Sequence, residues 1–195
     1  MSLPLRSRPA GPPAASVRPT HSGIGRSSSE AAEQVSDDLR RHDSPALRRR
    51  RRAGALNLVS VAALALVETY QLGLLRRVPE LPLPGVDADA VDASGEAYVL
   101  FGTPDSALGL ASYAGTLALI GMGAADRSTR HPWIPLLAAA KVSADVLSSG
   151  YLFAEQVTKH RKICTWCTAA ALASLVSLPT VLPEAREALV TLRRR

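Results

Sequence analysis

The chain has 195 residues, of which 47% are hydrophobic and only 4% aromatic, and its formal net charge is +6. A basic balance of this size fits nucleic acid or an anionic membrane surface as a partner, so the position of the charge must decide between them. The mean hydropathy of +0.07 is typical of a soluble domain, but the apolar residues are too unevenly distributed along the chain for one.

Residues 1–52 carry the entire net charge, with eleven arginines against five acidic residues. They are rich in Pro, Ser and Gly and cannot bury enough apolar surface to offset the entropy of ordering, so we predict a disordered basic tail. One stretch, "SEAAEQVSDDLRRH" from Ser29, begins with a capping serine and predicts a transient helix. The tail ends in "RRRRR" (Arg48 to Arg52), directly before an apolar run. This position favours a cytoplasmic topology anchor over a nucleic-acid-binding arm or a secretory signal.

Four apolar segments of about 20 residues follow, each long enough for a helix to cross the ~30 Å hydrocarbon core of a membrane. They cover residues 53–75, 106–125, 132–154 and 163–183. None of them alternates as the amphipathic helices of a soluble bundle do. We therefore predict an all-α, integral membrane four-helix bundle at 53–183, preceded by the disordered basic tail and followed by a short basic tail at 184–195.

The basic residues that flank the spans predict the orientation of the chain. Arginines before the first span place the N-terminus in the cytoplasm, and four spans return the C-terminal "RRR" (Arg193 to Arg195) to the same side. We expect a multi-pass protein of the cell membrane that contacts membrane lipid and no nucleic acid. One loop, "EQVTKHRK" at 155–162, is basic although this orientation would export it.

Both cysteines of the chain, Cys164 and Cys167, lie at the predicted exported start of the fourth span. At positions i and i+3 of a helix they share a face, and a helix N-terminus stabilises a thiolate, as thiol–disulfide exchange requires. On spacing alone, inert packing remains an alternative, and so does a metal site that borrows His160. Haem attachment is excluded because Thr168 stands where that motif needs a histidine. A zinc site has no fourth ligand nearby, so no metal is predicted.

Three stretches of the sequence resemble the vitamin K epoxide reductase family. They are "ICTWCTAAALAS", "LFGTPDSALGLASY" (Leu100 to Tyr113) and, less specifically, "VSADVLSSGYLFAEQ", and the likeness covers roughly 53–183. The resemblance implies an enzyme, a quinone-linked thiol oxidoreductase with four core helices. Its substrates would be exported protein thiols and a membrane quinone of the menaquinone, ubiquinone or phylloquinone type. Cys167 would lie nearest the quinone, and Cys164 would exchange with the incoming thiol or disulfide.

The resemblance also implies five residues of a quinone pocket. Phe101, Gly102 and Pro104 match the turn where the exported loop re-enters the membrane, and Tyr113 matches the second helix. Trp166, between the cysteines, matches an aromatic wall for a flat ring. For all five, simple packing is the alternative, and Trp166 also suits an interfacial belt.

One departure from the family concerns the exported loop, "RRVPELPLPGVDADAVDASGEAY" at 76–98. Family members usually carry a second cysteine pair there, whereas this loop has none, and Asp89 stands near the place of one, with Asp87 and Asp92 beside it. Either an exported thioredoxin-like or other thiol protein engages the CxxC pair directly, or a partner supplies the relay pair, or redox activity has decayed. The alternative function is a non-enzymatic four-helix membrane protein with a structural CxxC and a basic tail that binds lipid or a partner. We also expect residues 86–91 to cover the site, because a quinone site benefits from the exclusion of water.

The third span contains two charges, Lys141 and Asp145, at positions i and i+4. Their spacing predicts an ion pair within one helix. A structural pair is the preferred interpretation, and proton exchange at Asp145 is the alternative, because charges inside a membrane segment are costly unless they serve a function.

Overall fold

The computed structural model describes residues 29–80 and 82–195, whose regular structure is helical apart from one isolated bridge between Val86 and Ile163. In chain order the elements are α1 (Glu30–Arg41), α2 (Pro45–Gln71), α3 (Ala88–Asp92), the 3-10 turn η1 (Gly95–Tyr98), α4 (Asp105–Gly121), α5 (Arg127–Arg130), α6 (Trp133–Glu155), the π-helical turn η2 (Gln156–His160) and α7 (Thr165–Arg193). The described chain is therefore all-α, as predicted.

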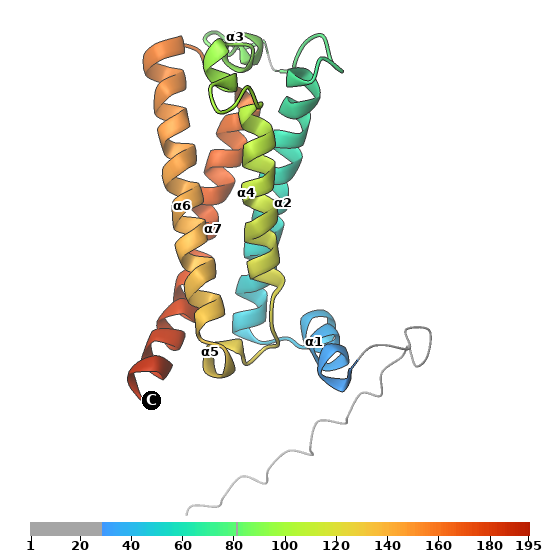
Figure 1. The fold of residues 1–195 in the computed structure, drawn as a ribbon, viewed down its shortest axis with the longest axis vertical. Helices are drawn as coiled ribbons and strands as arrows, with labels where there is room; N and C mark the ends of the chain where they lie inside the picture. The colour runs from blue at the N-terminus through green and yellow to red at the C-terminus, as the bar shows by residue number, and fades with distance from the viewer. Residues whose placement is uncertain (1–28, 81) are drawn as a thin grey trace, which may run out of the picture.

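Four long helices, α2, α4, α6 and α7, run side by side along the molecule (Figure 1). Helix α7 packs against α2 and α6, and α4 packs against the same two helices, so the four close into a bundle. Helix α3 lies over one end of the bundle, while α1, α5 and the C-terminus lie at the other (Figure 1). We call the end beside α3, where Cys164 begins α7, the cysteine end, and the end that holds Arg50 and Arg127 the arginine end.

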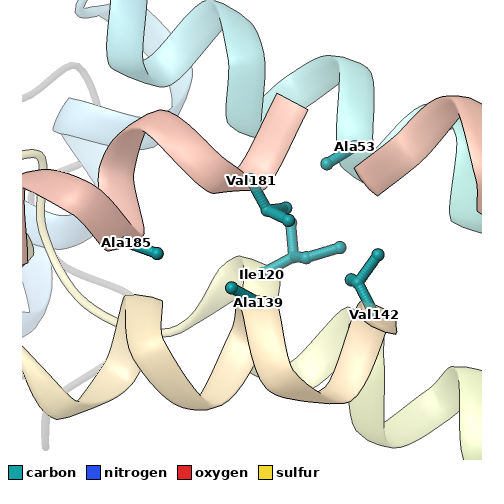
Figure 2. Close-up of a cluster of buried hydrophobic side chains, with 6 residues drawn as sticks. All are labelled: Ala53, Ile120, Ala139, Val142, Val181 and Ala185. Atoms are coloured by element: carbon teal, nitrogen blue, oxygen red, sulfur yellow. The ribbon is translucent and has the colours of Figure 1, made fainter. Parts of the chain in front are cut away.

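The interior of the bundle is built largely from small side chains. Figure 2 shows a buried cluster to which all four long helices contribute, made of Ala53, Ile120, Ala139, Val142, Val181 and Ala185. Small residues let helix backbones approach closely, which is how helices associate where burial of apolar surface gives little driving force. Large apolar side chains point outward instead, for example Leu58, Leu147 and Leu172. This inside-out distribution suits a bundle surrounded by lipid.

Three of the described helices are long and apolar enough to cross a membrane: α2, α6 continued through η2 (Trp133–His160), and α7. The fourth predicted span, 106–125, corresponds to α4, which has only 17 residues and is about 25 Å long. It ends early because the chain leaves the helix at Met122, and Gly123 follows with φ +83°. A fourth crossing therefore stays a prediction.

The predicted disordered tail differs from the structure over 29–52, where most of the chain is helical. The helix expected from Ser29 is present as α1, and its Ser29 hydroxyl accepts from the Ala32 N–H at 3.2 Å. Helix α2 begins at Pro45, and the Ser44 hydroxyl caps it by accepting from the Leu47 N–H at 3.2 Å. The five arginines therefore belong to its first turns, because a capping serine followed by proline starts a helix before the apolar run. Residues 1–28 of the predicted tail lie outside the described residues.

The predicted C-terminal tail is also part of a helix, since α7 continues past Pro183 to Arg193. Glu184 is buried and accepts two hydrogen bonds from the Arg127 guanidinium, both at 2.7 Å. Arg127 and Arg50 also donate to backbone carbonyls of 119–124. These carbonyls lie at and just beyond the end of α4, where the last carbonyls of a helix have no hydrogen-bond donor within the helix. These buried contacts fix the arginine end and carry α7 beyond the expected boundary at 183.

Candidate active site

The cysteine pair lies where α7 begins, at the cysteine end of the bundle. Cys164 is the N-cap residue, and its Sγ accepts from the Cys167 N–H at 3.2 Å. Both are free thiols in the structure. Cys164 is fully buried, whereas Cys167, one turn further along, is half-buried. The predicted placement of the pair at a helix N-terminus is confirmed.

The loop between α2 and α4 covers Cys164 and is fastened to the start of α7. The Glu80 carboxylate joins the two, because Oε1 accepts from the Thr165 N–H at 2.8 Å and Oε2 accepts from the Ala88 N–H at 2.5 Å. The Trp166 indole N–H donates to the carbonyl of Pro79 at 2.8 Å. Two backbone hydrogen bonds complete the attachment of the loop to α7. The Ile163 N–H donates to the carbonyl of Gly85, and the Asp87 N–H donates to the carbonyl of Ile163. The predicted cover over 86–91 is therefore present.

A cavity of about 130 Å³ opens beneath this cover. All four long helices and the loop contribute to its wall, which includes the apolar side chains Leu64, Val67, Val91, Leu152 and Ala170 and the polar side chains Asp92, Ser106, Tyr113, Asp145 and Cys167. An engineered apolar cavity of about 150 Å³ binds benzene, so this cavity approaches the volume that a single six-membered ring needs. Of the two thiols, only Cys167 lies on the wall.

Asp92, at the end of α3, faces the cysteines and is the site residue that the sequence analysis did not select. Its side chain is 2% exposed, and the Cys167 thiol donates to Oδ1 at 3.5 Å. Burial raises the pKa of Asp92 to about 6, although hydrogen bonds from Cys164 and Cys167 act in the opposite direction. The signal in the sequence was the spacing of Ala88, Val91 and Asp92, which puts all three on one buried face of a helix.

The donor atoms of Asp92, Cys164 and Cys167 lie within 4.8 Å of one another. Two thiolates and a carboxylate are possible zinc ligands, but in the described part of the chain this group has three donors, fewer than the four protein ligands of a structural zinc site. Three protein ligands and a water are the set of a catalytic zinc site, but the donors alone do not show that a metal binds. We therefore treat it as a thiol–carboxylate cluster and assign no metal to it.

The five predicted quinone residues divide into one on the cavity wall and four away from it. Tyr113 is buried on the wall, with Oη 2.8 Å from the Ser174 Oγ. Phe101 is 96% exposed in the turn before α4, and Phe101 and Gly102 both have positive φ values, +56° and +65°.

Pro104 is the N-cap residue of α4, and Trp166 packs against the loop rather than the cavity. The turn before α4 is therefore present, but these four residues do not line the cavity that Cys167 and Tyr113 share.

The two charges of the third span form the predicted ion pair. Lys141 Nζ and Asp145 Oδ1 are 2.5 Å apart, and the hydroxyls of Ser112 and Thr116 on α4 donate to the two oxygens of Asp145. Both carboxylate oxygens thus have partners. The pair joins α6 to α4, and Asp145 also forms part of the cavity wall.

These features define a class of protein: a helical membrane bundle with a vicinal thiol pair beside an internal, ring-sized cavity under a loop. The sequence model of the Vitamin K epoxide reductase family matches residues 53–182, so the chain belongs to that family. Members are oxidoreductases that generally use quinones. A search of the curated proteins found no match to this sequence.

Proposed function

We propose that the chain oxidises thiols of exported proteins through the Cys164–Cys167 pair and passes the electrons to a membrane quinone. The observation that carries this proposal is the position of Cys167 on the wall of an internal cavity, with Cys164 one turn away under the loop. A bound quinone supplies a two-electron, two-proton acceptor. Which of the menaquinone, ubiquinone and phylloquinone types it is remains a prediction.

The residues of the cavity suit a quinone ring. Its apolar side chains allow a flat ring to pack, and its wall also carries hydroxyls, for example those of Ser106 and Tyr113. To donate to ring oxygens, these hydroxyls would exchange their present partners, Glu68 or Gln71 for Ser106 and Ser174 for Tyr113. The family membership supports the same substrate class. In this arrangement Cys167 is the thiol that exchanges electrons with the ring, and Tyr113 helps to orient it.

Cys164 is the residue that we expect to exchange with the partner protein, yet it is fully buried. A nucleophile must approach the sulfur directly in thiol–disulfide exchange, so the loop has to move away from α7 before a partner can react. Because the loop contains no cysteine, the partner's own thiols must reach the pair. An exported thioredoxin-like protein, or another protein with paired thiols, meets this requirement.

The distribution of charge supports an orientation with the cysteine end exported. Arg48 to Arg52 lie at the arginine end, as do Arg127, Arg130 and the C-terminus (Figure 1). Cytoplasmic flanks of membrane spans carry the excess of arginine and lysine, so we place both termini in the cytoplasm of a multi-pass cell-membrane protein.

The test is a turnover assay on the purified full chain in lipid nanodiscs, with dithiothreitol as the dithiol and short-chain menaquinone or ubiquinone analogues as acceptors. We expect one quinone reduced per dithiol oxidised, and loss of this activity in both Cys164→Ser and Cys167→Ser. If the wild-type chain reduces neither quinone above the level of empty nanodiscs, the proposal is wrong. A structural role for the CxxC in a non-enzymatic membrane protein would then be favoured.

A further inference from the structure

Among the buried charged groups of the described chain, Asp92 stands apart because one of its oxygens has no partner. Arg127 and Glu184 neutralise each other, and both oxygens of Asp145 accept hydrogen bonds. Asp92 Oδ2, by contrast, is buried without a hydrogen-bond partner, and no cation within 29–80 and 82–195 forms an ion pair with Asp92. Its backbone carbonyl accepts from the Gln71 side chain, which holds the residue in place.

The groups that face Asp92 are thiols and acids. Helix α7 contributes Cys164 and Cys167, α4 contributes Asp105, and the loop contributes Glu80. His160 of η2 lines the same cavity, but it pairs with Glu96 at 3.0 Å rather than with Asp92. From α2, Tyr70 is close enough for its phenol to interact with the Asp92 charge. Since no cation pairs with Asp92, its burial disfavours the carboxylate and raises the pKa of Asp92 towards neutrality. Within the described residues, the two thiols are the groups that hydrogen-bond to its side chain and can exchange a proton with it.

The other oxygen of Asp92, Oδ1, accepts from the Cys167 thiol, whose sulfur forms and breaks bonds in the proposed reaction. Oδ1 is 3.5 Å from the Cys167 Sγ, within hydrogen-bond range for sulfur, and both Asp92 and Cys167 line the cavity. Buried ionisable groups that are kept in a cavity without a neutralising partner are often functional, because a purely structural role would favour an apolar residue.

From this geometry we propose that Asp92 is a catalytic acid–base residue, which donates a proton to Cys167 and takes it back during each cycle. The inference rests on the proposed function, because it assigns the proton path of that reaction. It applies to the thiol chemistry of this chain alone and needs no direct contact between Asp92 and the quinone.

The reaction has two half-reactions, in which Asp92 first gives up a proton and then takes it back. A partner thiolate attacks Cys164 Sγ, the Cys164–Cys167 bond breaks, and the leaving Cys167 thiolate takes the proton of the Asp92 carboxylic acid. The partner's second thiolate then attacks the partner sulfur that is bonded to Cys164 in the mixed disulfide. This attack forms the partner's own disulfide and releases Cys164 as a thiolate, which takes a proton from solvent. When the Cys164–Cys167 bond forms again, Cys167 returns its proton to Asp92 and Cys164 releases its proton to solvent. The two electrons pass to a bound quinone, which would take up two protons from solvent. Asp92 thus ends the cycle protonated, as it began.

The first readout needs no quinone. In a Cys164→Ser background, the alkylation rate of Cys167 by iodoacetamide is measured against pH on the full chain in nanodiscs. If Asp92 and Cys167 share a proton, the logarithm of the rate rises with pH, flattens near the pKa of Asp92, about 6, and rises again. Asp92→Asn removes the flattening, and the rate at pH 8 increases because no carboxylate opposes the thiolate. Asp92→Glu keeps the carboxylate and retains the flattening, which separates loss of the acid from loss of folding.

The second readout is turnover with dithiothreitol and a quinone analogue. We expect Asp92→Asn to slow turnover about 100-fold, the usual scale for general acid–base catalysis, although its Cys167 is more reactive. The matched control is Asp87→Asn, at the N-cap of the same short helix. It keeps a capping side chain and the backbone bond to Ile163, and it loses only a partly exposed ion pair with Lys162, 3.8 Å long, which contributes little. It should leave both readouts unchanged.

The two readouts separate the possible failures. An unchanged pH profile in Asp92→Asn overturns the inference, as does an Asp87→Asn variant that is equally slow. A flattened profile that depends on Asp92, in a chain that does not reduce quinone, supports the shared proton and contradicts the proposed function instead.

Discussion

The loop that covers the cysteine pair depends on Glu80, so Glu80→Gln should expose Cys164. In the structure the two carboxylate oxygens accept from the N–H groups of Thr165 and Ala88, which start α7 and α3. A glutamine offers one acceptor oxygen and one NH₂ group, so at least one of the two charge-assisted bonds is lost. The helix N-termini also lose the favourable effect of a negative charge.

The size of the effect follows from the bonds. A hydrogen bond to a charged group contributes roughly 1.5–3 kcal/mol, and the lower half of this range applies because Glu80 is only half-buried. A loss of about 1.5–2 kcal/mol corresponds to a population of the open loop that is roughly 10–30 times larger. Cys164 is fully buried, so it reacts only when the loop opens, and its alkylation rate should rise by the same factor.

The assay is time-resolved alkylation of the reduced full chain in nanodiscs, followed by mass spectrometry of the peptides that contain each cysteine. Cys167 already lies on the cavity, so its rate should rise less than that of Cys164. Asp87→Asn, a carboxylate-to-amide change in the same loop, serves as the control. It keeps its capping side chain and its backbone bond to Ile163 and loses only a partly exposed ion pair with Lys162, so it should change neither rate much. An unchanged Cys164 rate in Glu80→Gln would show that the loop is not held by Glu80, and the reasoning would fail.

Three further predictions concern stability and the cavity. Glu184→Ala leaves the Arg127 charge buried without its partner and should lower the free energy of unfolding by about 3–5 kcal/mol. Thermal unfolding in detergent measures this loss, and a loss below about 1 kcal/mol would contradict the buried ion pair described above. Because the folded state raises the pKa of Asp92 from 3.8 to about 6, it binds more protons than the unfolded state in that window, so stability should fall as pH rises from 4 to 7. Asp92→Asn should reduce this pH dependence and be the more stable form at pH 7, whereas an identical melting profile would refute it. A Cβ on Gly109 would lie 2.5 Å from the Leu64 Cδ1, so Gly109→Ala should push the Leu64 side chain into the cavity. We expect a higher KM for quinone and no slower alkylation of Cys167. An unchanged KM would indicate that the ring binds elsewhere.

The bundle and the place of the cysteines were predictable because both depend on local patterns. Apolar runs of membrane-crossing length predict helices without knowledge of their neighbours, and the CxxC spacing places two thiols on one helical face. The ion pair between Lys141 and Asp145 follows from the same local rule.

The features that the sequence did not predict depend on contacts between distant segments. Helix α7 extends beyond 183 because Glu184 meets Arg127, which lies 57 positions away. The place of Asp92 depends on where a short loop helix docks against α7, and neither charge pattern nor hydropathy specifies that docking. Of the pocket residues taken from the family resemblance, Tyr113 lies on the wall, whereas Phe101 belongs to an exposed turn outside the cavity. After this turn the wall continues with Asp105 and Ser106 of α4.

The most direct test of the central claim is the redox state of the cysteine pair in native membranes. After mild reduction, membranes are incubated with or without added menaquinone or ubiquinone, and free thiols are counted by alkylation mass shift. The account predicts that quinone reoxidises both Cys164 and Cys167, and that Cys167→Ala leaves Cys164 alkylatable whether or not quinone is present. If both thiols stay free and quinone has no effect on the wild-type chain, the pair does not exchange electrons with quinone and the account is wrong.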